Sequence, residues 1–229
     1  IRYFNGGVIM FDFSRVSWVK VQSKTIETLV MTFESLAAVV IIGICLGLLL
    51  YLSSNSNGAF GRIFYAVVSA IVNIFRAIPF IILIVLLLPF TKTLVGSISG
   101  PQAAMPALIL SAAPFYARLV EIGLREVDKG VIEAARAMGA KKITIVTKVL
   151  IPESLPAIVS GLTVTAIALV GSTAMAGVIG AGGLGNLAYL DGFQRNNNTL
   201  TFVATVLILV IVFAIQILGD FVVKRIDKR

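Results

Sequence analysis

The sequence has no histidine and a single cysteine in 229 residues. Histidine is the commonest general base near neutral pH and the commonest metal ligand, so its absence excludes histidine-dependent catalytic and metal sites. The one cysteine, Cys45, can form neither an intramolecular disulfide nor a thiolate metal cluster. Because Cys45 lies within an apolar run, we expect it to be a small buried side chain.

Charge is also scarce. Only 13% of the residues are charged and 58% are hydrophobic, whereas a soluble domain usually has about twice that charged fraction. This composition excludes a soluble globule, a disordered chain, a collagen-like fibre and a coiled coil. The net charge of +8 comes from basic residues that flank apolar runs, which indicates contact with a membrane surface and not with nucleic acid. We therefore predict an all-α integral membrane protein.

Five apolar runs are long enough to cross a bilayer as helices, which need roughly 20 residues each. They lie near residues 29–52, 77–95, 102–122, 155–179 and 199–223. Residues 25–229 are expected to form a single transmembrane domain, after a poorly defined N-terminal extension at 1–24. With the C terminus inside, thirteen of the nineteen lysines and arginines lie on the cytoplasmic side, Arg62 and Arg76 among them. Cytoplasmic loops are enriched in these residues, so we expect a cytoplasmic C terminus.

The long cytoplasmic connection at 123–154 contains a short helical pattern. Asp128 is a suitable N-cap and Gly139 a suitable stop for a helix in which Val131, Ala135 and Met138 recur at helical spacing. The pattern predicts a short amphipathic helix with small residues that permit close approach. Two interpretations stay open at this point: a connector that lies at the membrane interface, and a docking element for a soluble partner.

The residues within and after this helix are similar to a family motif. They resemble the EAA motif of ATP-binding-cassette importer permeases at Glu133, Ala134, Ala135, Gly139, Val149, Ile151 and Pro152. The usual motif has isoleucine and leucine where this chain has Val149 and Ile151, which are conservative apolar changes. The resemblance extends over residues 26–229 and is greatest to the methionine-uptake branch, through the segments SAIVNIFRAIPFIIL, AAPFYARLVE, IPESLPAIVSGL and GAGGLGNLAY.

This resemblance implies a transport system of several subunits. It implies the five-helix type I importer permease fold with a short cytoplasmic coupling helix, and a homodimer in a bacterial cell membrane. It also implies two cytoplasmic ATP-binding subunits and an extracytoplasmic substrate-binding protein. Coupling to the ATPase would involve Glu133, Ala134, Ala135, Met138, Gly139, Val149, Ile151 and Pro152. The chain has no G-x-x-x-x-G-K-[ST] phosphate loop, so we expect no enzymatic activity and no cofactor on it, with ATP and Mg on the partner ATPase.

Glycines cluster at the end of the fourth span and after it, at Gly171, Gly177, Gly180, Gly182, Gly183 and Gly185. Three of them satisfy G-x-G-x-x-G, but the match follows a membrane helix and lacks the βαβ context of a dinucleotide site. The cluster indicates a bent loop or close helix packing, or else a part of the transport pathway, for which Gly171 and Gly177 are candidates. The resemblance implies that Met175 narrows the outer end of the pathway; a methionine packed against lipid or a helix is the alternative.

Two charged residues in apolar surroundings are further pathway candidates. Arg76 is interpreted either as an arginine whose head reaches the headgroup phosphates or as a structural tie near the cytoplasmic mouth of the pathway. Glu34 lies about five residues into the first predicted span and shares a helix face with Glu27 and Met31. That face looks toward the pathway or the binding protein, or else Glu34 snorkels to the outer headgroups.

The other transport and enzyme classes fit less well. A secondary transporter normally has an internal repeat and deep ionisable residues, and an intramembrane enzyme needs a nucleophile and a base. The function predicted is the permease subunit of an ATP-driven methionine importer. The alternatives are an importer permease for another small solute, such as a polar amino acid or a phosphonate, and a channel.

Overall fold

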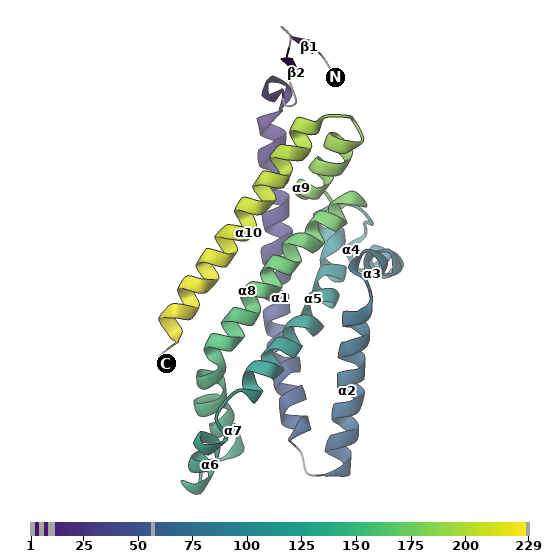
Figure 1. The fold of residues 1–229 in the computed structure, drawn as a ribbon. Coiled ribbons are helices and arrows are strands. Elements are labelled where there is room, and N and C mark those ends of the chain that lie inside the picture. Colours follow the sequence, from purple (N-terminus) through teal and green to yellow (C-terminus); the bar gives the residue numbers. More distant parts are fainter. Residues whose placement is uncertain (1–2, 5–6, 9–11, 56–57, 228–229) are drawn as a thin grey trace. The chain divides into compact units, whose positions relative to one another are not determined.

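The computed structural model describes residues 3–4, 7–8, 12–55 and 58–227. Within these residues, five helices are long and apolar enough to cross a membrane. They are α1 (Trp18–Ser54), α2 (Ala59–Ala77), α5 (Pro101–Arg125), the continuous helix Lys142–Val178 and α10 (Asn198–Ile226) (Figure 1). The predicted all-α fold with five transmembrane helices is confirmed.

The prediction that the second span lies near residues 77–95 is wrong. Residue Ile78 is extended, as expected before a proline, and ends α2. The following apolar run is divided into α3 (Phe80–Leu86) and α4 (Leu88–Val95), with Pro89 in the first turn of α4. Each of these helices is too short to cross a bilayer. The segment that qualifies is α2, which precedes the predicted span.

This correction changes the expected position of Arg76. Arg62 lies in the first turn of α2 and Arg76 in its last turn. At 1.5 Å per residue the two are about 21 Å apart along the helix axis. They cannot both lie at one membrane surface, as the predicted topology required. Moving Arg76 to the other side still leaves most basic residues on the side of the C terminus.

The fourth long helix begins earlier than predicted. It consists of α7 (Lys142–Ile145), the π-helical segment η2 (Val146–Leu150) and α8 (Ile151–Val178). The connection predicted to extend to residue 154 therefore ends at residue 141. Pro152 and Pro156 each remove a backbone donor from this helix, and the π-helical segment directly before them is the kind of local adjustment that accommodates proline.

The remaining elements are short. They are β1 (Tyr3–Phe4), β2 (Gly7–Val8), the 3-10 turn η1 (Phe13–Arg15), α6 (Lys129–Ala137), α9 (Gly183–Asn186) and the π-helical segment η3 (Leu187–Phe193). The strands pair antiparallel, with Tyr3 opposite Val8. Of the predicted N-terminal extension, residues 1–2, 5–6 and 9–11 lie outside the described residues. Residues 18–24 belong to α1, so the first helix starts well before the predicted span.

The chain packs as two compact units. Unit 1 comprises Ile1–Leu36, Pro79–Ile109 and Ile167–Ala214, and unit 2 comprises Ala37–Ile78, Leu110–Ala166 and Ile215–Arg229. Helices α1, α5, α8 and α10 each contribute residues to both units. The single domain expected over 25–229 stays a prediction.

Helices of unit 2 approach one another at glycines, as is common in membranes. A Cβ atom on Gly43 of α1 would lie 2.5 Å from Tyr116 Cδ1 of α5, and one on Gly47 would lie 2.6 Å from Val120. Helix α5 is the most buried of the five long helices. The glycines of α1 therefore let α5 pack at close range.

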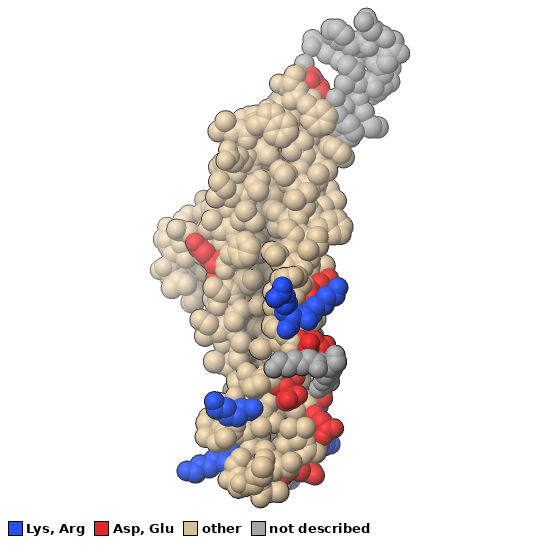
Figure 2. Space-filling model, turned by 90° about the vertical axis from the view of Figure 1, so that its left-hand side faces the viewer, with Lys and Arg blue, Asp and Glu red and all other residues tan. Residues whose placement is uncertain are grey.

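Many large apolar side chains face outward. Phe213, Ile217 and Leu218 of α10 are each more than 60% exposed, and uncharged residues cover most of the face shown in Figure 2. Cys45 is also exposed, so its predicted burial within the chain is wrong. Such a surface requires lipid or another protein subunit to cover it.

Candidate functional site

Helix α6 has the cap and the stop that the sequence predicts. The Asp128 Oδ1 atom accepts hydrogen bonds from the backbone N–H of Gly130 at 2.6 Å and of Val131 at 3.3 Å. At the other end Gly139 has φ +80°, and its N–H donates to the Arg136 carbonyl at 2.9 Å. Both ends are fixed by local interactions, which explains why a helix of nine residues is well defined.

The two faces of α6 differ from the predicted pattern. Ile132 and Ala135 are buried, whereas Val131 is 43% and Met138 is 82% exposed. The predicted apolar set of Val131, Ala135 and Met138 is therefore not one buried face. Val131, Ala134 and Met138, spaced at i, i+3 and i+7, instead form an exposed strip of small and flexible apolar side chains.

The other residues of the EAA-like motif lie in neighbouring elements. Glu133 is exposed and has no ion pair among the described residues. Helix α6 packs against α7 and η2, so the structure brings the first part of the motif close to η2, which carries Val149. Val149 and Ile151 are half-buried, while Pro152 is exposed.

The glycine cluster of unit 1 divides into packed and open positions. A Cβ atom on Gly177 would lie 2.7 Å from the Gly182 carbonyl oxygen. By contrast, a Cβ atom on Gly171 would meet nothing within 4 Å, and Met175, one turn further along the same face of α8, is 51% exposed. Gly177 is thus explained by packing, whereas Gly171 and Met175 present an open surface on α8.

A contact that the sequence did not predict holds residues 180–185, which we call the glycine loop, to α1. The Gly183 N–H donates to Glu27 Oε2 at 2.7 Å, and the Leu184 N–H donates to Thr28 Oγ1 at 2.8 Å. Gly183 has φ +73°, which favours glycine. Lys24 pairs with the same carboxylate at 2.8 Å. Two side chains of α1 thereby bind backbone donors at the start of α9.

The two charged pathway candidates lie apart. Glu34 is exposed on α1, sixteen residues after its start, and has no ion pair among the described residues. Glu27 and Met31 do not share its surroundings, because Met31 is fully buried and Glu27 binds the glycine loop. Arg76 is exposed in the last turn of α2, with its guanidinium carbon 6.0 Å from the centre of the Phe115 ring.

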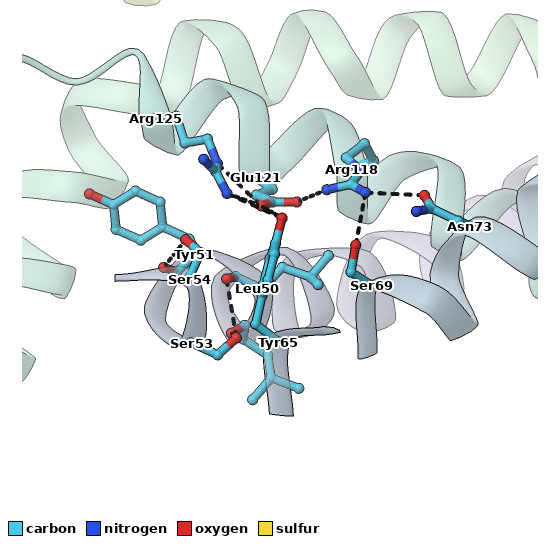
Figure 3. Close-up of polar contacts among 11 residues, drawn as sticks. Leu50, Tyr51, Ser53, Ser54, Tyr65, Ser69, Asn73, Arg118, Glu121 and Arg125 are labelled. Atoms are coloured by element: carbon cyan, nitrogen blue, oxygen red, sulfur yellow. Dashed lines mark hydrogen bonds and ion pairs between the residues drawn. The ribbon is translucent and has the colours of Figure 1, made fainter. Parts of the chain in front are cut away.

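A second unpredicted group lies in unit 2. Glu121 of α5 is 1% exposed and forms ion pairs with Arg118 at 2.6 Å and Arg125 at 2.7 Å (Figure 3). Arg118 and Glu121 lie near the end of the apolar run at 102–122, and that run alone predicts no role for them. A basic residue lies three positions before Glu121 and another lies four positions after it. This helical spacing is the pattern that could have predicted the ion pairs.

These features can be compared with those of known proteins. Residues 43–229 match the family described as binding-protein-dependent transport system inner membrane component. The methionine import system permease protein MetP of Bacillus subtilis (strain 168) is 62% identical over 222 residues, which cover 96% of this chain and 100% of that protein. The probable D-methionine transport system permease protein MetI of Pasteurella multocida (strain Pm70) is 44% identical and covers 93% of this chain and 98% of its own length.

The fold is also similar to that of a methionine transporter chain. A chain of the MetNI methionine ABC transporter, solved in an inward-facing conformation, superposes with a TM-score of 0.88 and is 45% identical. The match covers 92% of this chain and 98% of that one. Sequence and fold agree over nearly the whole length, and the chain belongs to the family of binding-protein-dependent transport system inner membrane components.

Proposed function

We propose that this chain is the permease subunit of an ATP-driven methionine importer. The observation that carries the proposal is α6: a capped helix, in a chain of this family, whose Val131, Ala134 and Met138 side chains are exposed. A separate ATPase subunit binds ATP and Mg and docks on this strip. Methionine is proposed as the substrate because the MetP and MetI relatives are named for methionine transport. Their sequences match this chain over most of its length.

The proposed assembly has two copies of this chain, two ATPase subunits and a binding protein on the opposite side of the membrane. The exposed apolar surfaces support a second copy, because a second copy would cover them. One of these surfaces is the open face of α8 at Gly171 and Met175. In this assembly the C terminus and α6 face the cytoplasm, in accordance with the excess of basic residues near them. The open face of α8 borders the pathway, and Met175 narrows it.

The decisive experiment is uptake of labelled methionine by proteoliposomes that contain the chain, its ATPase and its binding protein. We expect uptake that requires ATP and stops when the ATPase is omitted. Uptake of a polar amino acid or a phosphonate in place of methionine would contradict the substrate. Flux without the ATPase subunit would contradict the importer and favour a channel.

Docking on α6 can be tested at Met138, the exposed apolar residue that directly follows this helix. Met138→Asp should prevent co-purification of the ATPase subunit, because a charged side chain would enter an apolar contact. Since Met138 is 82% exposed, the permease itself should fold normally. Val19→Asp, at a residue 81% exposed on α1, is the matched control and should leave the complex intact. Normal ATPase binding by Met138→Asp would rule out this docking surface.

The pathway and the orientation can be tested with single cysteines in a Cys45→Ser background. Met175→Cys should crosslink between two copies to an extent that depends on the nucleotide state. Met138→Cys should react with membrane-impermeant maleimide only when the cytoplasmic surface is accessible. Equal crosslinking in every state would exclude Met175 as the gate, and labelling of Met138→Cys in intact cells would reverse the proposed orientation.

A further inference from the structure

Polar side chains join helices α2 and α5 within unit 2. Helix α2 buries only Ser69 and Val72, although it is 19 residues long. Glu121 of α5 faces α2. Its side chain is among the largest that are fully buried in the described residues. A carboxylate buried to this degree is stable only when charge partners and hydrogen-bond donors surround it.

The partners of Glu121 on its own helix neutralise its charge. Arg118 Nη1 donates to Glu121 Oε2 at 2.6 Å, and Arg125 Nη2 donates to Oε1 at 2.7 Å. Both pairs lie within α5, at i, i+3 and i, i+4 spacing. They account for the charge of the carboxylate but do not by themselves connect α5 to another helix.

The connection comes from Tyr65, Ser69 and Asn73, which are one turn apart along a single face of α2. The Tyr65 hydroxyl donates to Glu121 Oε1 and accepts from Arg125 Nη2, each at 3.3 Å. Arg118 Nη2 donates to Ser69 Oγ and to Asn73 Oδ1, each at 3.1 Å. In Figure 3 the three α2 side chains point toward the two arginines and the carboxylate of α5. We refer to these six residues, Tyr65, Ser69, Asn73, Arg118, Glu121 and Arg125, as the Glu121 cluster.

The cluster lies directly before the helix on which the ATPase is proposed to act. Helix α5 ends at Arg125, and α6 begins at Lys129 after three residues. A displacement of α6 is therefore passed to α5 through a very short connection. Side-chain bonds to charged groups are among the strong hydrogen bonds of proteins, so α2 is held to α5 at this point.

We propose that Glu121 is a positioning residue for transport. By orienting Arg118 and Arg125 toward α2, it fastens α2 to α5, and α2 follows the movement of α5 and α6 when the ATPase acts. The inference rests on the proposed function, because it requires α6 to be the point where force is applied. It adds that α2, which has no contact with the ATPase in this proposal, moves as one body with the docking helix.

The test removes the α2 side of the cluster and leaves the ion pairs of α5 intact. In the triple variant Tyr65→Phe, Ser69→Ala and Asn73→Ala, we expect ATP hydrolysis and complex assembly to persist. Methionine imported per ATP hydrolysed should fall about tenfold, because the hydrogen bonds between the helices are lost. The control is Thr93→Val with Thr205→Val, whose hydroxyls bond only within their own helices; it should keep the wild-type ratio. A wild-type ratio in the triple variant would overturn the proposal.

A distance measurement separates this inference from the proposed function. Spin labels at Ile71→Cys of α2 and Ile122→Cys of α5, both half-exposed positions, are introduced with Cys45→Ser. The label distance should be the same with and without ATP in the otherwise wild-type complex and should change with ATP in the triple variant. A change in the wild-type complex would overturn the inference even if methionine uptake is normal. Absence of methionine uptake with an unchanged distance would contradict the proposed methionine importer but not the fastening of α2 to α5.

If the triple variant does not assemble, the single variant Tyr65→Phe gives the answer. It removes one hydroxyl that bonds to both Glu121 and Arg125. We expect the ratio of import to hydrolysis to fall about two- to threefold in this variant. A wild-type ratio in Tyr65→Phe, together with failed assembly of the triple variant, would mean that the cluster only supports folding, and the proposal would be wrong.

Discussion

Each of the two units uses a glutamate from a long helix to fix a neighbouring segment, but the two glutamates bind different groups. In unit 1, Glu27 accepts a backbone N–H from the glycine loop. In unit 2, Glu121 accepts side-chain donors from two arginines and a tyrosine. The N–H groups of the first residues of a helix, such as Gly183 of α9, have no partner within that helix, whereas those in the middle of a helix are already bonded. The kind of segment to be held thus decides which donors the carboxylate meets.

The largest effect is expected at Glu121. Glu121→Ala leaves Arg118 and Arg125 without their carboxylate and should destabilise the permease by about 3–5 kcal/mol. Glu34→Ala is the control, since Glu34 is exposed on α1; its change in stability should stay within about 0.5 kcal/mol. Thermal unfolding of the purified chain in detergent measures both. Equal losses would show that burial does not distinguish the two carboxylates.

The next effect concerns packing around the glycine loop. Gly177→Ala places a Cβ atom against the Gly182 carbonyl and should cost about 3 kcal/mol. Gly171→Ala, on the same helix, meets open space and should be neutral or stabilise the chain by about 0.5–1 kcal/mol. The same unfolding measurement compares them. A loss of stability in both variants would contradict the division into packed and open glycines.

A smaller effect is expected where α1 binds the loop backbone. Thr28→Val leaves the buried Leu184 N–H without its acceptor and should cost about 2 kcal/mol. Thr25→Val removes a hydroxyl that bonds only to the Val21 carbonyl of its own helix, so it should cost less than about 0.5 kcal/mol. Hydrogen exchange at the Leu184 amide is the sharper measurement. Unchanged protection of that amide in Thr28→Val would show that the loop is held by other contacts.

Local patterns predicted much of this structure. The cap at Asp128, the stop at Gly139 and four of the five long helices follow from residues that are neighbours in the sequence. The error at 77–95 arose because apolar composition does not reveal where a helix breaks. The extended residue before Pro79 and the new start at Pro89 divide a run that is long enough to cross a bilayer.

The contacts that fix each unit could not be predicted in the same way. Glu27 and Gly183 are 156 residues apart in the sequence, and Tyr65, the partner of Glu121 on α2, is 56 residues from it. Each of these residues has an ordinary explanation when it is considered alone. Only the packing of the helices shows that Tyr65 meets the Glu121 carboxylate and that Ser69 and Asn73 meet its partner Arg118.

The length of α1 has a consequence for the position of the glycine loop. Its 37 residues extend about 55 Å, whereas the hydrocarbon layer is about 30 Å thick. The polar first turns, which include Lys20, Lys24 and Glu27, precede the apolar run that starts at Leu29. Those turns stand among the lipid headgroups or beyond them, and they hold the loop at that level. The hydrogen bonds from Gly183 and Leu184 to α1 therefore lie outside the hydrocarbon layer, beyond the apolar run of that helix.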